Sequence, residues 1–203
     1  MKNRINPDID HSRSTKRIVN FSDAVFAVAI TLLVVQIPIP VNAPDRELGD
    51  DLVGNIPMFT SYAISFGVLA LLWLKHLHFN NHVKRYSVGL IWLNFFFLLV
   101  IAFLPFPTGV YGTHPGDEVA QVFYAAVISL AGFLAALMWL LVLRQPGLLH
   151  DDIDEQEVRH SMRVSMIMPT GFAVSIVFSF FYPAIMPYIW MVFAAASPLM
   201  RKI

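Results

Sequence analysis

The chain contains six apolar runs, each close to the length that a helix needs to cross a lipid bilayer. A spanning helix takes about 20 residues, and in lipid every backbone polar group must be bonded within the segment. The runs cover about 18–38, 57–79, 88–111, 119–143, 161–183 and 184–200. The sequence therefore predicts an all-α polytopic membrane protein, with six transmembrane helices in one domain over residues 1–203.

The last two runs meet at Tyr182-Pro183 without a polar spacer. We expect them to form a tight hairpin, because proline cannot continue a helix through its interior. The run over 184–200 is the shortest, so a re-entrant segment is the alternative to a sixth span.

Lysine and arginine residues are divided unequally between the two sets of loops. If the N-terminus is cytoplasmic, thirteen of them fall on the cytoplasmic side and only Arg46 falls outside. Cytoplasmic loops of membrane proteins carry such an excess, so we expect both termini to be cytoplasmic. The thirteen are Lys2, Arg4, Arg13, Lys16, Arg17, Lys75, Lys84, Arg85, Arg144, Arg159, Arg163, Arg201 and Lys202. The first run is too long for a signal peptide, so the mature multi-pass protein is expected to keep it in the cell membrane.

Composition argues against several kinds of site. The chain has no cysteine, which excludes disulfides and thiolate chemistry, and its formal net charge of zero suggests no nucleic-acid partner. The spans contain no Ser–His or paired-carboxylate constellation, so neither an enzyme nor a cofactor is expected. His78 and His82 share a helical face, but they lack an acidic or thiol companion. Interfacial histidines are therefore favoured over a metal site.

Asp23 is the only acidic residue within the apolar runs. An ionised group there costs about 2.5 to 3.5 kcal/mol on insertion scales, so it needs a partner or a wet cavity. His76 and Asn94 are expected in the same third of the bundle and are the predicted donors to Asp23. A local cap or kink formed by Ser22 and Asp23 is the alternative to a buried network. Arg17 is six residues from Asp23 and does not form a helical pair with it, so its partner must lie elsewhere or in the headgroups.

The first run also carries a stripe of modest-sized side chains. The stripe consists of Val28, Thr31, Leu32 and Val35. At the rotation of a regular helix these residues lie within about 100° of one another, and Asp23 points about 130° away. If Asp23 faces its own subunit, the stripe faces lipid, a neighbouring helix or a central axis.

The segment Thr108-Gly109-Val110-Tyr111-Gly112 contains the residue types of the Thr-Val-Gly-Tyr-Gly filter of conventional potassium channels. The carbonyl ring of that filter depends on residue order, and here the order differs. We interpret the segment as the outer end of the third span.

Four motifs in the first half of the chain form a recognisable set. They are Arg17-x-x-x-Phe21-Ser22-Asp23, Trp73-x-x-His76, Asn94 and Pro105-Phe106-x-Thr108. Together they resemble bacterial members of the transmembrane protein 175 family, the endolysosomal-type potassium channels. The resemblance implies a homotetramer in the bilayer, in which each chain contributes its first helix to a central pore without a re-entrant filter loop.

The resemblance also implies roles for individual residues. It places a hydrophobic constriction at Val28, a threonine layer at Thr31 and further pore-lining turns at Leu32 and Val35. Potassium is the implied permeant ion, passing transiently near Thr31, with other monovalent cations as further candidates. The remaining motif residues would form a structural network that holds the pore helix against its own subunit. They are Arg17, Phe21, Ser22, Asp23, His76 and Asn94.

A proton-coupled secondary transporter that uses Asp23 as its titrating carrier is the alternative function. Such transporters have internal repeats and helices interrupted in the middle by glycine or proline. The first run has no such interruption, whereas Pro169 and Gly171 in the fifth run keep the alternative open.

Overall fold

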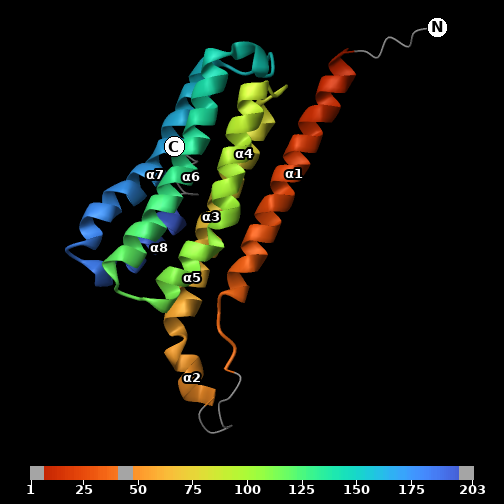
Figure 1. Cartoon of the computed structure of the whole chain (residues 1–203). Coiled ribbons are helices and arrows are strands. Elements are labelled where there is room, and N and C mark those ends of the chain that lie inside the picture. The colour runs from red at the N-terminus through yellow and green to blue at the C-terminus, as the bar shows by residue number, and fades with distance from the viewer. Residues whose placement is uncertain (1–6, 41–47, 197–203) are drawn as a thin grey trace.

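The computed structural model describes residues 7–40 and 48–196, with side chains described from residue 13 to residue 192 in these ranges. This part of the chain is helical and contains no β-strand. Its elements are α1 (Pro7–Val35), α2 (Leu48–Gly54), α3 (Ile56–His82), α4 (Val88–Phe103), α5 (Pro105–Thr113), α6 (Glu118–Arg144), η1 (Pro146–Leu148), α7 (Glu155–Ser179), η2 (Pro183–Ile185) and α8 (Met186–Ala196) (Figure 1). The predicted all-α class is confirmed.

Within residues 7–40 and 48–196, five segments are long and apolar enough to cross a membrane. They are Arg13–Val35, Ile56–His82, Val88–Thr113, Glu118–Arg144 and Glu155–Ser179. These match the first five predicted runs, although the first and fifth helices begin and end several residues earlier than expected. The predicted sixth span is not confirmed, because the apolar helix over Pro183–Val192 is shorter. The end of the predicted run over 184–200 lies outside the described residues.

The third span is broken at Leu104, in its C-terminal half. Helix α4 ends at Phe103 and α5 begins at Pro105, and the Leu104 N–H donates to the Ile101 carbonyl (3.2 Å) in a tightened turn. Proline has no N–H and its ring clashes with the carbonyl four residues earlier, so Pro105 and Pro107 can only stand in the first turn of a new helix. The filter-like segment Thr108–Gly112 is helical within α5, in line with its interpretation as the end of this span.

Helices α6 and α7 form the most extensive helix pair of the subunit. They approach closely at Gly132, where a Cβ atom would lie 2.7 Å from Cβ of Pro169. Helix α8 turns back after Pro183, as the predicted hairpin requires, and packs against α7 and α3. Its Trp190 is fully buried and donates from Nε1 to the Ser175 hydroxyl (3.0 Å).

Helix α1 stands at one side of the bundle and diverges from α4 toward its N-terminal end (Figure 1). It packs against α3, α4 and α5. This peripheral position leaves one face of α1 without a partner in its own subunit.

The charged residues mark the two ends of the bundle. Every described lysine and arginine lies toward the end where α1 and α7 begin and where α3 and α6 finish. They are Arg13, Lys16, Arg17, Lys75, Lys84, Arg85, Arg144, Arg159 and Arg163. We call this the basic end. The other five basic residues, Lys2, Arg4, Arg46, Arg201 and Lys202, lie outside the described residues, as do both chain termini.

Candidate pore helix and its polar network

One face of α1 is anchored in the subunit core. Ser22, Phe26, Ala29 and Leu33 recur at helical spacing, and each is at most 1% exposed. The ring of Phe26 lies 5.7 Å from that of His76 on α3 and 5.8 Å from that of Phe97 on α4. This contact stripe fixes which side of α1 faces its own subunit.

The stripe predicted from the sequence lies on a different face of the same helix. Val28 is 56% exposed, Leu32 is 43% exposed and Val35 is 71% exposed. Thr31 is also exposed, and its hydroxyl donates to the Val28 carbonyl (2.9 Å). Since a hydroxyl oxygen has two lone pairs, Thr31 keeps acceptor capacity while its proton is used within the helix.

A chain of buried hydrogen bonds joins α1 to α4 and α3. Asn94 on α4 donates from Nδ2 to the Ser22 hydroxyl oxygen (3.1 Å), and Ser22 donates in turn to the Ile18 carbonyl (2.9 Å). The other amide atom of Asn94, Oδ1, accepts from Nε2 of His76 on α3 (2.9 Å). The side-chain amide of Asn94 therefore links α1 to α3, because its Nδ2 donates to one helix and its Oδ1 accepts from the other.

The same contacts define the protonation of His76. An amide oxygen only accepts, so Nε2 carries the hydrogen and Nδ1 is free to accept from Nδ2 of Asn80 (3.1 Å). Oδ1 of Asn80 accepts from the Tyr86 hydroxyl (2.6 Å), and burial raises the pKa of Tyr86, which keeps that hydroxyl protonated. The neutral imidazole thus satisfies every bond of a relay that runs from Tyr86 to the backbone of α1.

Asp23 has a different partner from the one expected. Its Oδ1 accepts from the indole Nε1 of Trp73 (2.9 Å), and the residue is partly buried. His76 and Asn94, the expected donors, bond to each other and to Ser22 instead. The reason is rotational: Ser22 lies on the buried stripe, about 100° around the helix from Asp23. Trp73 stands one turn before His76 in the Trp73-x-x-His76 motif, and its N–H is a donor only.

Arg17 and Phe21 lie at the edge of this network. Arg17 is exposed at the basic end and makes no hydrogen bond or ion pair with any residue that the structure describes. Phe21 is 51% exposed and meets Phe95 of α4 edge-on, with ring centroids 5.9 Å apart. The structure therefore brings Ser22, His76 and Asn94 together and leaves Arg17 apart from them.

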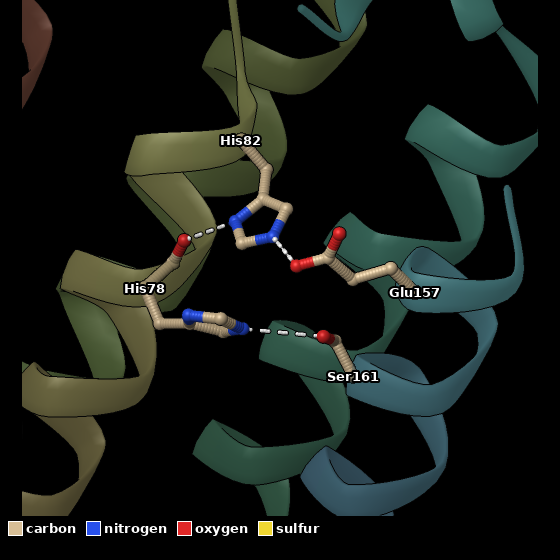
Figure 2. Close-up of polar contacts among 4 residues, drawn as sticks. All are labelled: His78, His82, Glu157 and Ser161. Atoms are coloured by element: carbon tan, nitrogen blue, oxygen red, sulfur yellow. Dashed lines mark hydrogen bonds and ion pairs between the residues drawn. The ribbon is translucent and has the colours of Figure 1, made fainter. Parts of the chain in front are cut away.

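The side chains of His78 and His82 point from α3 toward Glu157 and Ser161 of α7 (Figure 2). Nδ1 of His82 bonds to the His78 carbonyl (2.7 Å), and its Nε2 bonds to Oε1 of Glu157 (3.1 Å). Nε2 of His78 bonds to the Ser161 hydroxyl (3.2 Å). Glu157 is an acidic neighbour that sequence spacing did not reveal, because it comes from another helix. Even so, no group of three His, Asp or Glu side chains in the described part of the chain is placed to hold a metal.

The comparisons with known proteins concern the same segment. The family model for the endosomal/lysosomal potassium channel TMEM175 matches residues 17–105, from the start of the polar network to the break in the third span. A potassium channel from Streptomyces collinus is 32% identical over 147 residues, which cover 70% of this chain and 71% of that channel. This chain belongs to the TMEM175 family.

Other relatives extend the family match over most of the chain. A potassium channel from Chamaesiphon minutus is 29% identical over 171 residues, covering 82% of this chain and 84% of that one. The crystal structure of a lysosomal potassium-selective channel TMEM175 homolog from Chamaesiphon minutus matches with a TM-score of 0.82 and 25% identity. That match covers 94% of this chain and 100% of the other. Membership of a family of ion channels establishes a multi-pass membrane protein and excludes an enzyme.

Proposed function

We propose that this chain forms a potassium-selective cation channel as a homotetramer, with α1 of each copy lining a central pore. The observation that carries the proposal is the division of α1 into two faces, one packed on its own subunit and one exposed stripe. Only 22% of the apolar stretch of α1 is buried in the subunit, against 33% to 50% in the other four spans. Relatives that are themselves named potassium channels support the choice of ion.

The exposed stripe would supply both the gate and the selectivity of this pore. Rings of Val28, Leu32 and Val35 narrow a water-filled path and close it by dewetting. Four Thr31 hydroxyl oxygens face a passing ion, and potassium is favoured over sodium because the larger ion loses its hydration at lower cost. No re-entrant filter loop takes part, and no resident cofactor is needed.

The polar network would hold α1 in the rotation that keeps this stripe at the axis. Ser22 and Asp23 are bonded to Asn94 and Trp73, so turning the helix breaks two polar contacts within the membrane. Arg17 is assigned to the headgroup region, where an exposed guanidinium is stable. The network residues thus support the pore without touching the ion.

The basic end is proposed to face the cytoplasm, in keeping with the positive-inside rule. All described lysines and arginines lie at that end, which supports a cytoplasmic N-terminus. A sixth membrane crossing that brings the C-terminus to the same side completes the proposed topology.

Reconstitution of the purified chain in liposomes tests the function. A channel gives potassium flux that runs down the gradient, saturates only at high potassium concentration and leads to a potassium diffusion potential.

Replacing Thr31 with alanine is expected to lower the potassium to sodium permeability ratio. Thr60→Ala on α3 is the control, because Thr60 is only partly buried and its hydroxyl also bonds its own helix backbone (2.9 Å). An unchanged ratio in Thr31→Ala would remove Thr31 from the selectivity mechanism.

The constriction has its own test. Val28→Ala widens the narrowest ring and is expected to raise conductance, whereas Val174→Ala, at a position that is 50% exposed on α7, should leave it unchanged. Equal conductance in both variants would place the gate elsewhere.

The transporter alternative requires Asp23 to exchange protons during each cycle. In the structure α1 is continuous over Pro7–Val35, and Asp23 is bonded to Trp73. The test is to impose a proton gradient and measure potassium uptake. Accumulation of potassium against its own gradient that is abolished by Asp23→Asn would show that the protein is a coupled transporter and not a channel.

A further inference from the structure

A pocket opens at the basic end, where α1 diverges from the bundle. Its volume is about 330 Å³. Lys16 and Asn20, one turn apart on α1, form one wall, and Asn81 near the end of α3 and Lys84 just after it form another. His150, from the segment before α7, completes the rim.

The lining of this pocket has the chemistry of an anion site. It contains two ammonium groups, a histidine and three asparagine amides, and no carboxylate is among its lining residues. Lys84 also meets Asp151 at 2.9 Å, but the side chains of this pair are 47% and 90% exposed. An exposed ion pair contributes little and exchanges readily, so Lys84 remains available to another anion.

The depth of the pocket also restricts its ligand. It lies beside the last residues of α3 and the first turns of the α1 span. In a bilayer that these spans cross, this is the level at which headgroups would meet the hydrocarbon core. Val19 and Val83 give it an apolar side next to its charged rim. A phosphate group has the several acceptor oxygens that ammonium and amide donors can bind together.

We propose that this pocket between α1 and the end of α3 binds a phosphate group, carried either by an anionic phospholipid headgroup or by free phosphate. The site is separate from the exposed stripe of α1 and does not depend on ion conduction. It adjoins the buried relay, because Asn80 both lines the pocket and donates to His76. A ligand here would bridge α1 and α3 outside the bonds that already join them.

The proposal is tested by isothermal titration calorimetry with the full-length protein in a neutral detergent at physiological salt. The probes are short-chain phosphatidylglycerol, phosphatidylcholine of the same chain length, and inorganic phosphate. Saturable binding of phosphatidylglycerol alone identifies the lipid source, and saturable binding of inorganic phosphate identifies the free anion. Failure of both anions to bind would overturn the proposal, as would equal affinity for the zwitterionic lipid.

Three variants separate a built site from diffuse attraction. Lys16→Gln removes one ammonium, and Asn20→Asp places a carboxylate in the pocket with almost no change in size. Each is expected to weaken binding by about tenfold or more, as loss of a charge-assisted contact does. Arg163→Gln is the control, because it removes one exposed charge from the same end outside the pocket lining and should change affinity by less than about threefold under screening.

Equal losses of affinity in Lys16→Gln and Arg163→Gln would mean that binding depends only on the overall charge of the basic end. That result would overturn the proposal of a specific site. If Lys16→Gln does not fold, Asn20→Asp is the test variant. Unchanged affinity for the anions in Asn20→Asp would contradict the proposal. Thermal unfolding of each variant without ligand shows that it is folded before binding is measured.

Discussion

Asn94 joins three helices through a single amide. It donates to Ser22 of α1 and accepts from His76 of α3, and it is 1% exposed. Because Asn94 and both of its partners are buried, loss of the amide leaves a donor on His76 and an acceptor on Ser22 with no water at hand to replace it. Buried polar groups left in this state cost about 1 to 3 kcal/mol each.

Asn94→Ala is therefore expected to lower the free energy of unfolding by about 2 kcal/mol or more. The measurement is the thermal midpoint of the purified protein in detergent. Asn81→Ala is the matched control, since Asn81 is exposed at the end of α3 and should give almost no change. Equal midpoints for the two variants would show that the relay does not stabilise the subunit.

Trp73 is the second test at the scale of single residues. Trp73→Phe keeps an aromatic ring but removes the N–H that binds Asp23, so a partly buried carboxylate loses its donor. A hydrogen bond to a charged group contributes about 1.5 to 3 kcal/mol, and we expect a loss of stability in that range. Trp92→Phe is the control because Trp92 is 60% exposed.

Asp23→Asn keeps an oxygen that can accept from Trp73, so its effect on stability should be smaller than that of Trp73→Phe. In the proposed tetramer it is expected to weaken assembly more than ion selectivity, because the bond between Asp23 and Trp73 ties α1 to α3. If Trp73→Phe and Trp92→Phe lose equal stability, the observed bond between Trp73 and Asp23 contributes nothing.

The sequence was informative about which residues are polar within the membrane and less informative about which of them meet. Helical periodicity separated Val28 from Asp23 on α1, because that angle is local and depends only on the spacing of residues. The partner of Asp23 depends instead on how α3 and α4 are rotated against α1, which hydropathy does not encode. For the same reason Glu157 was not expected beside His82, since the two lie on different helices.

At the scale of helices, the bounds of most spans follow from composition, because a run of apolar residues must end where the bilayer ends. Ile56–His82 and Glu118–Arg144 lie within a few residues of the predicted runs. The break at Leu104 was not predicted, although Pro105 and Pro107 are visible in the sequence. Hydropathy averages over such a break, whereas the missing proline N–H interrupts the hydrogen bonds locally.

The pairing of α6 with α7 depends on a glycine. A Cβ atom on Gly132 would lie 2.7 to 2.9 Å from three ring atoms of Pro169, and a proline ring cannot rotate away. Gly132→Ala is thus expected to push the two helices apart and to lower the unfolding free energy by about 1 to 3 kcal/mol, despite the better helix propensity of alanine.

Gly89→Ala on α4 provides the comparison, because its Cβ would meet only Leu141 Cδ1 at an ordinary 3.8 Å. Thermal unfolding of both variants is the measurement. If Gly132→Ala is as stable as Gly89→Ala or more stable, α6 and α7 can move apart to accept the methyl group without loss of unfolding free energy.

At the scale of the whole molecule, two asymmetries have to be explained together. Basic side chains gather at one end of the bundle, and the least buried span lies at its side. The first asymmetry orients a chain in a membrane, and the second leaves an elongated face for contact with lipid or with further copies. The proposed cyclic assembly around α1 would cover this face without any change in the fold of the subunit.

The absence of cysteine makes this assembly directly testable, because one introduced thiol is the only thiol in the protein. Val35→Cys places it on the exposed stripe of α1, far from the basic end, and Phe66→Cys places it on an exposed position of α3. In the proposed tetramer a cationic, membrane-impermeant methanethiosulfonate added outside reaches Val35→Cys through the pore mouth. It is expected to reduce potassium flux in liposomes to a small fraction, while Phe66→Cys and the unmodified protein keep their flux. Block of Phe66→Cys with Val35→Cys unaffected would move the ion path from α1 to another face of the bundle.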